Sequence, residues 1–198
     1  MIAVTDYDTG NLRSVMNALQ RTGAEFVVTS DEAVLRSADK VIMPGVGEAS
    51  SAMQKLRERG LDRIIPSLTQ PVLGICIGMQ LMCEYSEEGD AECLGIFPTK
   101  VMKLPSELAG GELLKVPHVG WDTIENLRTP LFEGIKESSH LYYVHSFAAQ
   151  MCDATIASTT YGVEFSAALH RANFYGTQFH PEKSGTVGEA ILNNFLKL

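Results

Sequence analysis

Short apolar runs alternate with segments of helical periodicity through the first hundred residues, and this alternation constrains the fold most. The runs predicted as buried strands are residues 2–5, 25–29, 40–43 and 72–75. The predicted helices are roughly residues 12–22, 49–59, a short stretch before Pro71, and 78–85. In the first helix, apolar side chains recur at positions 12, 15, 16 and 19, and Gly23 ends the helix. Strands that alternate with helices predict a parallel sheet covered on both faces.

The pattern changes after residue 99, where β-rich segments are separated by turns rather than by long helices. These segments are residues 99–104, 141–144, 155–158, 165–170 and 174–179, and a helix over residues 187–196 follows them. We expect them to extend the same sheet in antiparallel or mixed fashion. The sequence has no repeat and no obvious linker, so residues 1–198 are predicted to form one α/β domain, an open and largely parallel sheet with this extension.

Composition and charge exclude several classes of partner. The chain has 198 residues, 45% of them hydrophobic, and a net charge of −8, which repels phosphate backbones and argues against nucleic acid. No apolar run approaches the ~18 residues that span a bilayer. The first residues read as a buried strand and lack the basic start of a signal peptide. We therefore expect no membrane association and a cytoplasmic location.

The four cysteines, at positions 76, 83, 93 and 152, form no Cys-x-x-Cys pair. Neither a zinc site nor a dithiol redox site is therefore indicated, and disulfides are not expected in a reducing cytosol. Cys83 is interpreted as a core residue, and Cys93 and Cys152 lie in turn-like surroundings. We expect no metal and no cofactor.

Cys76 is the candidate nucleophile because it lies where a predicted strand meets a predicted helix. The sequence there is Gly74-Ile75-Cys76-Ile77-Gly78, which has the spacing of the Gly-x-Ser-x-Gly nucleophile elbow. Small flanking residues let such a sharp turn close, and a helix start favours the thiolate. A buried cysteine in a tight loop explains this motif alone equally well.

His180 and Glu182 are the candidate base and its orienting group. They follow the predicted strand at residues 174–179, in the sequence Gln178-Phe179-His180-Pro181-Glu182. A thiol nucleophile needs a base to take its proton, and the base needs a third group to fix its tautomer. Two residues apart in extended chain, the two side chains are predicted to point the same way. A surface histidine and a metal site are the alternatives, but the Pro-Cys-x-x-Cys of zinc deaminases is missing.

The sequence Pro44-Gly45-Val46-Gly47 follows the third predicted strand. Glycines let backbone N–H groups approach a ligand, and a tetrahedral intermediate needs two such donors. We predict that residues 45–47 supply one donor, through Val46 or Gly47, and that the amide of Ile77 supplies the other. A plain turn before the following helix is the alternative.

Taken together, these motifs resemble the class I, triad-type glutamine amidotransferases, which carry a Pro-Gly loop, a Gly-x-Cys-x-Gly elbow and a late His-Pro-Glu in this order. Within that class, the chain is similar to the glutaminase subunits of imidazole glycerol phosphate synthases, enzymes of histidine biosynthesis. Further stretches carry this likeness: residues 8–12 (Asp-Thr-Gly-Asn-Leu), 117–121 (Pro-His-Val-Gly-Trp), 143–147 (Tyr-Val-His-Ser-Phe) and 178–184. The chain departs from the family pattern at Ile77, Val119 and Asp122, where Leu, Met and Asn are usual.

The resemblance implies that L-glutamine binds covalently through Cys76 as a γ-glutamyl thioester. The positions that it places around the substrate are Gly45, Gln80, Glu88, Tyr142, His145, Ser146 and Phe147. It also implies a (β/α)₈-barrel synthase subunit as partner, to which the ammonia passes inside a heterodimer. The positions that fall at that interface are Asn11, His118, Trp121 and Lys183. Residues 45–47 are predicted to rotate so that the donor faces the site only in the active state.

Three other interpretations compete with this one. The first is a glutaminase that feeds a different synthase, of the anthranilate or carbamoyl phosphate type. The second is a cysteine hydrolase of the same fold group, in which the base commonly follows the nucleophile directly, where this chain has Ile77. The third is a non-catalytic binding module, which an intact set of Cys76, His180 and Glu182 argues against.

Overall fold

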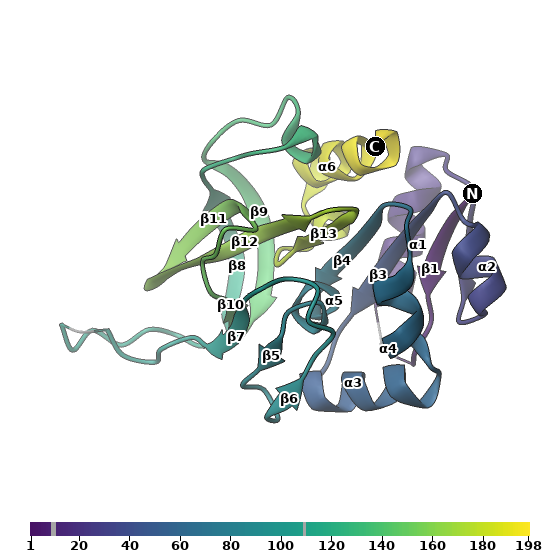
Figure 1. Ribbon diagram of the computed structural model, residues 1–198. Helices are drawn as coiled ribbons and strands as arrows, with labels where there is room; N and C mark the ends of the chain where they lie inside the picture. The colour runs from purple at the N-terminus through teal and green to yellow at the C-terminus, as the bar shows by residue number, and fades with distance from the viewer. Residues whose placement is uncertain (9–10, 109) are drawn as a thin grey trace.

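A central seven-stranded sheet organises the molecule (Figure 1). The computed structural model describes residues 1–8, 11–108 and 110–198. The strand order is β11-β12-β13-β4-β3-β1-β2; the pairs from β2 to β13 are parallel, and β12 and β11 add antiparallel pairs. The predicted parallel sheet with an antiparallel extension is confirmed. The strands are β1 (Ile2–Thr5), β2 (Phe26–Thr29), β3 (Lys40–Gly45), β4 (Val72–Cys76), β11 (Thr155–Tyr161), β12 (Val163–Arg171) and β13 (Phe174–Thr177).

Helices cover both faces of this sheet, and the central strands are therefore buried on both sides. The first helix, α1, contacts α6 on one face, and α3 and α4 lie against the other (Figure 1). Gly23 ends α1 in the left-handed conformation, with φ 74°, as predicted. The sequence analysis missed α2, which begins where the Asp31 side chain accepts a hydrogen bond from the Val34 amide. The helices are α1 (Leu12–Thr22), α2 (Glu32–Ser37), α3 (Ala49–Glu58), α4 (Leu61–Ile64), α5 (Ile77–Leu81) and α6 (Gly185–Lys197), with 3-10 turns η1 (Ile65–Ser67), η2 (Pro130–Phe132) and η3 (Pro181–Lys183).

Two smaller sheets correct part of the predicted extension. Residues 99–104 and 141–144 do not join the main sheet, whereas residues 155–158, 165–170 and 174–177 do. Residues 99–104, which were expected in the main sheet, contain β7, and in β7 only Val101 is fully buried. A strand with one apolar face suits a small sheet better than the centre of a parallel one. The first small sheet has the order β10-β7-β5-β6 and the second is the β8–β9 ribbon; their strands are β5 (Tyr85–Ser86), β6 (Ala91–Glu92), β7 (Lys100–Lys103), β8 (His118–Ile124), β9 (Ser139–His145) and β10 (Phe147–Ala149).

The helix after the candidate nucleophile is shorter than predicted. It was expected over residues 78–85, but α5 ends at Leu81 and the chain enters β5 at Tyr85. The amides of residues 94–97 donate hydrogen bonds to the carbonyl oxygens of Leu81, the last helical residue, and of Met82 and Cys83, which follow it. These long-range hydrogen bonds satisfy the helix end, so the helix stops there.

One sequence motif is described only in part. Thr9 and Gly10, in the motif at residues 8–12, lie outside the described residues. Among the helices that are described, none has both the length and the apolar character needed to cross a membrane.

Candidate active site

Cys76 occupies a strained turn between β4 and α5. Its backbone has φ 53° and ψ −108°, a region that costs a residue with a side chain ~1–3 kcal/mol. The flanking glycines allow close approach: a Cβ at Gly74 would lie 2.7 Å from the amide of Met79, and one at Gly78 would overlap the carbonyl oxygen of Met43. The Gly-x-Cys-x-Gly motif therefore closes a tight turn, as predicted.

A pocket of about 290 Å³ opens beside Cys76 at the carboxyl ends of neighbouring strands. Gly45 pairs with Cys76 in the register of β3 and β4, so residues 46 and 47 follow directly beside the thiol. Gly47 has φ 103°, which favours glycine. The pocket is lined by Val46, Gly47, Cys76, Ile77, Gln80, Glu88, Pro117, Val144, His145, Ser146, Phe147, His180 and Lys183. All three residues predicted as oxyanion donors are among them.

His180 lines this pocket and contacts the buried Glu182. The Nδ1 atom of His180 is 2.8 Å from Oε1 of Glu182, and both residues are at most 8% exposed. The chain between them forms the 3-10 turn η3 rather than the extended segment that was expected. The predicted contact is present, but a turn that begins at Pro181 produces it, because the proline ring sets a φ suited to a first turn.

The other ring nitrogen of His180, Nε2, is buried and has no hydrogen-bond partner of ordinary geometry among the described residues. Burial alone would lower the pKa of His180. Interactions with the Cys76 and Glu182 side chains outweigh burial and raise that pKa to about 10. The imidazole therefore couples the thiol on one side to the carboxylate on the other.

Backbone bonds hold His180 in place against β9. Its amide donates to the carbonyl oxygen of Tyr142 at 2.9 Å. The hydroxyl of Ser184 donates to the His180 carbonyl oxygen at 2.6 Å and accepts from the Tyr142 amide at 2.9 Å. Both backbone groups of Tyr142 are thus used, and Tyr142 is not among the residues that line the pocket.

Asn11 contacts the candidate catalytic group directly. Its side-chain amide donates to Oε1 of Glu182 at 2.6 Å, across 171 residues of sequence. Asn11 itself has φ 74° at the start of α1, a conformation that asparagine tolerates better than most residues. The sequence analysis placed Asn11 at a partner interface and assigned it no contact with Glu182.

Gln80 and Glu88, which were predicted to hold the substrate, line the pocket. The Oε1 atom of Gln80 is buried and has no hydrogen-bond partner among the described residues. Burial raises the pKa of Glu88, although its carboxylate accepts a hydrogen bond from the Ala49 amide. Gly45 lies outside the lining, because its Cα faces the Tyr7 hydroxyl, which leaves no room for a Cβ.

A chain of polar contacts runs from β8 to the pocket wall. His145 Nδ1 donates to the Phe147 carbonyl oxygen at 2.9 Å, His145 Nε2 lies 3.1 Å from His118 Nδ1, and His118 Nε2 lies 3.2 Å from Asp122. The series ends in two groups that accept hydrogen bonds, the Phe147 carbonyl oxygen and the Asp122 carboxylate. Its three contacts therefore need three protons, whereas two neutral imidazoles supply two. Burial lowers the pKa of His118, with Asp122 opposing it, and lowers that of His145 to about 3. At neutral pH, this chain of contacts therefore lacks one of the three protons that it needs.

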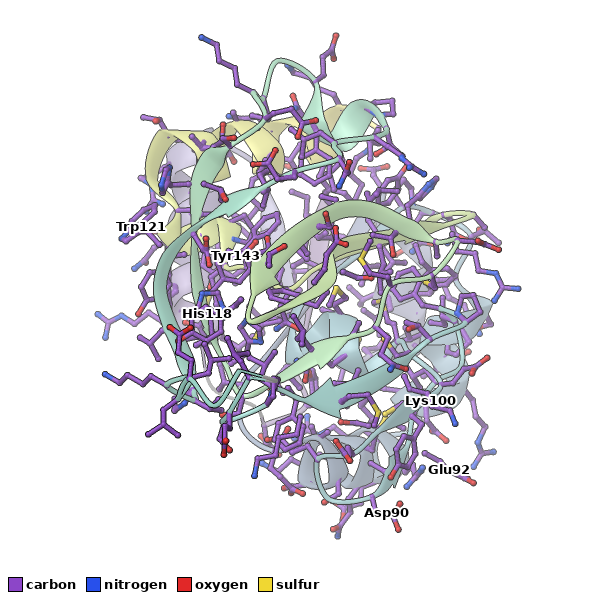
Figure 2. All side chains as sticks on the ribbon, turned by 90° about the vertical axis from the view of Figure 1, so that its left-hand side faces the viewer. Asp90, Glu92, Lys100, His118, Trp121 and Tyr143 are labelled. Carbon is purple, nitrogen blue, oxygen red and sulfur yellow. The ribbon has the colours of Figure 1, made fainter. Side chains whose placement is uncertain are left out.

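The outer side of the β8–β9 ribbon, which we call the ribbon face, is apolar and exposed. Val119 and Trp121 are 54% and 55% exposed, and Val144 is 37% exposed. Tyr142 packs edge-on against Trp121 at 6.0 Å, and the Lys183 ammonium lies 5.9 Å from the Tyr142 ring centre. Figure 2 shows Trp121 at the margin of the molecule, and His118, whose ring stacks on that of Tyr143, further in. The ribbon face adjoins the pocket, because Val144 belongs to both and because Lys183, which contacts Tyr142, also lines the pocket.

The remaining candidates have no place in this site. Cys83 is fully buried and burial raises the pKa of its thiol, in agreement with its assignment to the core. All four cysteines are free thiols. Within the described ranges, no group of three or more His, Cys, Asp or Glu side chains is arranged to hold a metal ion.

Gln178 is the main site residue that the sequence analysis missed. Its side-chain amide donates to the Cys76 sulfur at 3.6 Å and accepts from Gln80 at 2.9 Å. The available signal was the spacing of two residues between Gln178 and His180, which places both at the end of the same strand. Pro117 and Val144 also line the pocket; both lie in stretches that carried the family likeness, residues 117–121 and 143–147, but neither was assigned to the site.

Comparison with known proteins agrees with this geometry. Residues 3–198 match the family model of the class-I glutamine amidotransferases. The chain is 54% identical over 197 residues to the imidazole glycerol phosphate synthase subunit HisH of Bacteroides thetaiotaomicron, with 100% of this chain and 99% of the relative covered. It is 47% identical over 200 residues to the subunit of the same name from Haemophilus influenzae, with 100% and 98% covered.

A solved structure supports the same fold. The chain superposes on a glutamine amidotransferase with a TM-score of 0.74 at 18% identity, covering 100% of this chain and 98% of the other. At that identity the likeness concerns the fold alone. The elbow, the pocket and the full-length sequence matches together show that the chain belongs to the class-I glutamine amidotransferase family and, within it, to the HisH subunits of imidazole glycerol phosphate synthase.

Proposed function

We propose that this chain hydrolyses L-glutamine and supplies the ammonia to the synthase reaction of histidine biosynthesis. The observation that carries the proposal is the coupling of Cys76 to Glu182 through His180, whose Nδ1 is 2.8 Å from the carboxylate. A thiol and a base that line one pocket, with an orienting carboxylate in contact with the base, form the set that acyl transfer requires. The membership in the HisH subunits supports the choice of pathway.

In the proposed reaction, the Cys76 sulfur attacks the carboxamide carbon of glutamine. His180 holds the thiol proton and gives it to the departing nitrogen, so that ammonia leaves and a γ-glutamyl thioester remains. His180 then takes a proton from water, which attacks the thioester and releases glutamate while the proton returns to the sulfur. Glu182 holds the Nδ1–H tautomer of His180 throughout. One glutamine and one water yield one glutamate and one ammonia.

The pocket wall supplies the remaining proposed contacts. The amides of Ile77 and of Val46 or Gly47 stabilise the negative oxygen of the tetrahedral intermediate, since these residues adjoin the thiol. Gln80 and Glu88 hold the amino-acid end of the substrate. The half-buried carboxylate of Glu88 suits the substrate ammonium, and a bound cation would stabilise its ionised form.

The proposed partner is a (β/α)₈-barrel synthase subunit that docks on the ribbon face and forms a heterodimer with this chain. An exposed tryptophan in an apolar patch is typical of an interface centre. Since Val144 belongs both to the ribbon face and to the pocket lining, a partner bound there would adjoin the site where ammonia forms. Lys183 is also available to pair with an acidic group of the partner.

The test compares glutamate release by the unsubstituted chain with that by Cys76→Ala, each with and without the synthase subunit and its nucleotide substrate. Cys152→Ala, which changes a half-buried cysteine away from the pocket, is the matched control. We expect Cys76→Ala to abolish hydrolysis while it still binds the synthase subunit, and Cys152→Ala to retain activity. Hydrolysis by Cys76→Ala at the unsubstituted rate would refute the proposal.

A further inference from the structure

The amide of Gln178 has one permitted orientation, and neighbouring groups set it. The Phe147 carbonyl oxygen can only accept, so the Gln80 side chain must direct its NH₂ group toward that oxygen, at 2.8 Å. The same NH₂ group lies 2.9 Å from the other amide, which must therefore present its Oε1. Gln178 is left with its own NH₂ group directed at the Cys76 sulfur, at 3.6 Å.

Burial of the neighbouring groups holds the Gln178 amide in this orientation. Gln80 is 1% exposed, Gln178 is 0% exposed, and the Cys76 sulfur belongs to a residue that is 4% exposed. A flipped Gln178 would set its NH₂ group against the NH₂ group of Gln80 and its oxygen against the sulfur. The first contact would leave two buried N–H groups without an acceptor, and the second would set an oxygen against the thiolate, so the flipped orientation is disfavoured.

We propose that Gln178 is a catalytic residue whose side-chain amide donates a hydrogen bond to the Cys76 sulfur and stabilises the thiolate. This inference rests on the proposed role of Cys76 as nucleophile. It adds a donor to the thiol, the base and the orienting carboxylate, and the donor comes from the residue two positions before His180.

The chemistry of the donor suits both halves of the reaction. A hydrogen bond to an ionised acceptor is about twice as strong as one to a neutral acceptor. The bond from Gln178 is therefore weak while sulfur carries the acyl group and strong when the thiolate forms or departs, which is the differential stabilisation that accelerates a step. An amide has no titratable proton, so Gln178 does not compete with His180 for the thiol proton.

The primary experiment follows alkylation of Cys76 by iodoacetamide as a function of pH, with the modified peptide identified by mass spectrometry. Gln178→Leu removes the donor, and Gln178→Glu replaces it with a second oxygen. Gln70→Leu is the matched control, since Gln70 also donates a half-buried amide hydrogen bond, to the Leu35 carbonyl oxygen, at the opposite end of β4.

We expect the pH midpoint of Cys76 alkylation to rise by about one unit in Gln178→Leu, a tenfold smaller thiolate fraction below the midpoint. In Gln178→Glu the rise should be larger, because a carboxylate then faces the sulfur. Gln70→Leu should keep the unsubstituted midpoint. Midpoints that stay in place in the folded Gln178 variants, or that rise equally in Gln70→Leu, would overturn the proposal.

A second measurement uses no variant, so it does not depend on whether the substituted chains fold. In the unsubstituted protein, carboxamidomethylation of Cys76 should shift the side-chain ¹⁵N–¹H amide signals of Gln178, and raising the pH should shift them along the Cys76 alkylation curve. Signals that respond to neither would overturn the proposal. Both measurements report on the sulfur without glutamine, so a chain that shows these shifts but releases no glutamate would refute only the proposed function.

Discussion

The contact between Asn11 and Glu182 gives a sharp prediction, because the backbone and the side chain of Asn11 can be tested separately. Asn11→Gly removes the hydrogen bond at 2.6 Å but keeps a residue that tolerates φ 74°. Asn11→Asp keeps the shape of the side chain and sets a second carboxylate against Glu182. Asn11→Ala removes the bond and adds backbone strain, so it is the less informative variant.

The structure sets the expected size of each effect. In Asn11→Gly, Oε1 of Glu182 still accepts from His180 Nδ1, so this oxygen keeps a partner and only the net value of one hydrogen bond to a charged group is lost. That value is about 1.5 kcal/mol, or roughly a tenfold loss in kcat. In Asn11→Asp, two carboxylates compete at hydrogen-bond distance, and one of them is driven to take up a proton. The loss should then exceed a hundredfold at pH 8 and shrink as the pH falls, since protonation relieves the repulsion.

The assay is glutamate release at saturating synthase subunit, together with the dissociation constant of the complex. A residue that acts only at the interface would weaken the complex and leave kcat at saturation unchanged. A residue that holds Glu182 would lower kcat and leave the dissociation constant unchanged. If Asn11→Gly retains the unsubstituted kcat and pH profile, the contact with Glu182 contributes nothing to positioning His180.

Three further predictions follow from the geometry of the site. Gly78→Ala should lower the free energy of unfolding in urea by about 3 kcal/mol or more, because the new Cβ overlaps the backbone of β3; an unchanged midpoint would contradict the close approach. Cys76→Ala should lower the pKa of His180 from about 10, since interaction with the thiol raises it, and an NMR titration of the imidazole that still shows about 10 would contradict the coupling. Asp122→Asn should raise the free energy of unfolding at pH 8 by about 1 kcal/mol, because its amide donates the missing proton to His118; lower or equal stability would contradict the proton count.

Local patterns were enough to predict the parts of the site that depend on a few consecutive residues. The glycines at positions 74 and 78 have the spacing of a tight strand-to-helix turn, and the structure shows both packed against backbone. The spacing of two residues between His180 and Glu182 predicted side chains that point the same way, although the link is a 3-10 turn and not extended chain. Periodicity likewise gave α1 its observed bounds.

Long-range partners explain what could not be predicted. Asn11 meets Glu182 across 171 residues, and neither residue's neighbours in sequence record the other. The helix α5 ends early because residues 94–97 bind its last carbonyl groups, although the apolar pattern continues to Tyr85. The separate β8–β9 ribbon follows from which strands pair, and alternation within a strand does not specify its partner.

The position of β13 in the sheet has a consequence for the synthesis of the chain. This strand, at residues 174–177, lies between β4 and β12, although β4 ends about a hundred residues earlier. A chain still emerging from the ribosome contains the residues of β1 to β4 and Cys76 before it contains β13 and His180. Under the proposed mechanism, a chain truncated between β4 and β13 would hold the Cys76 thiol without His180 and would release no glutamate from glutamine.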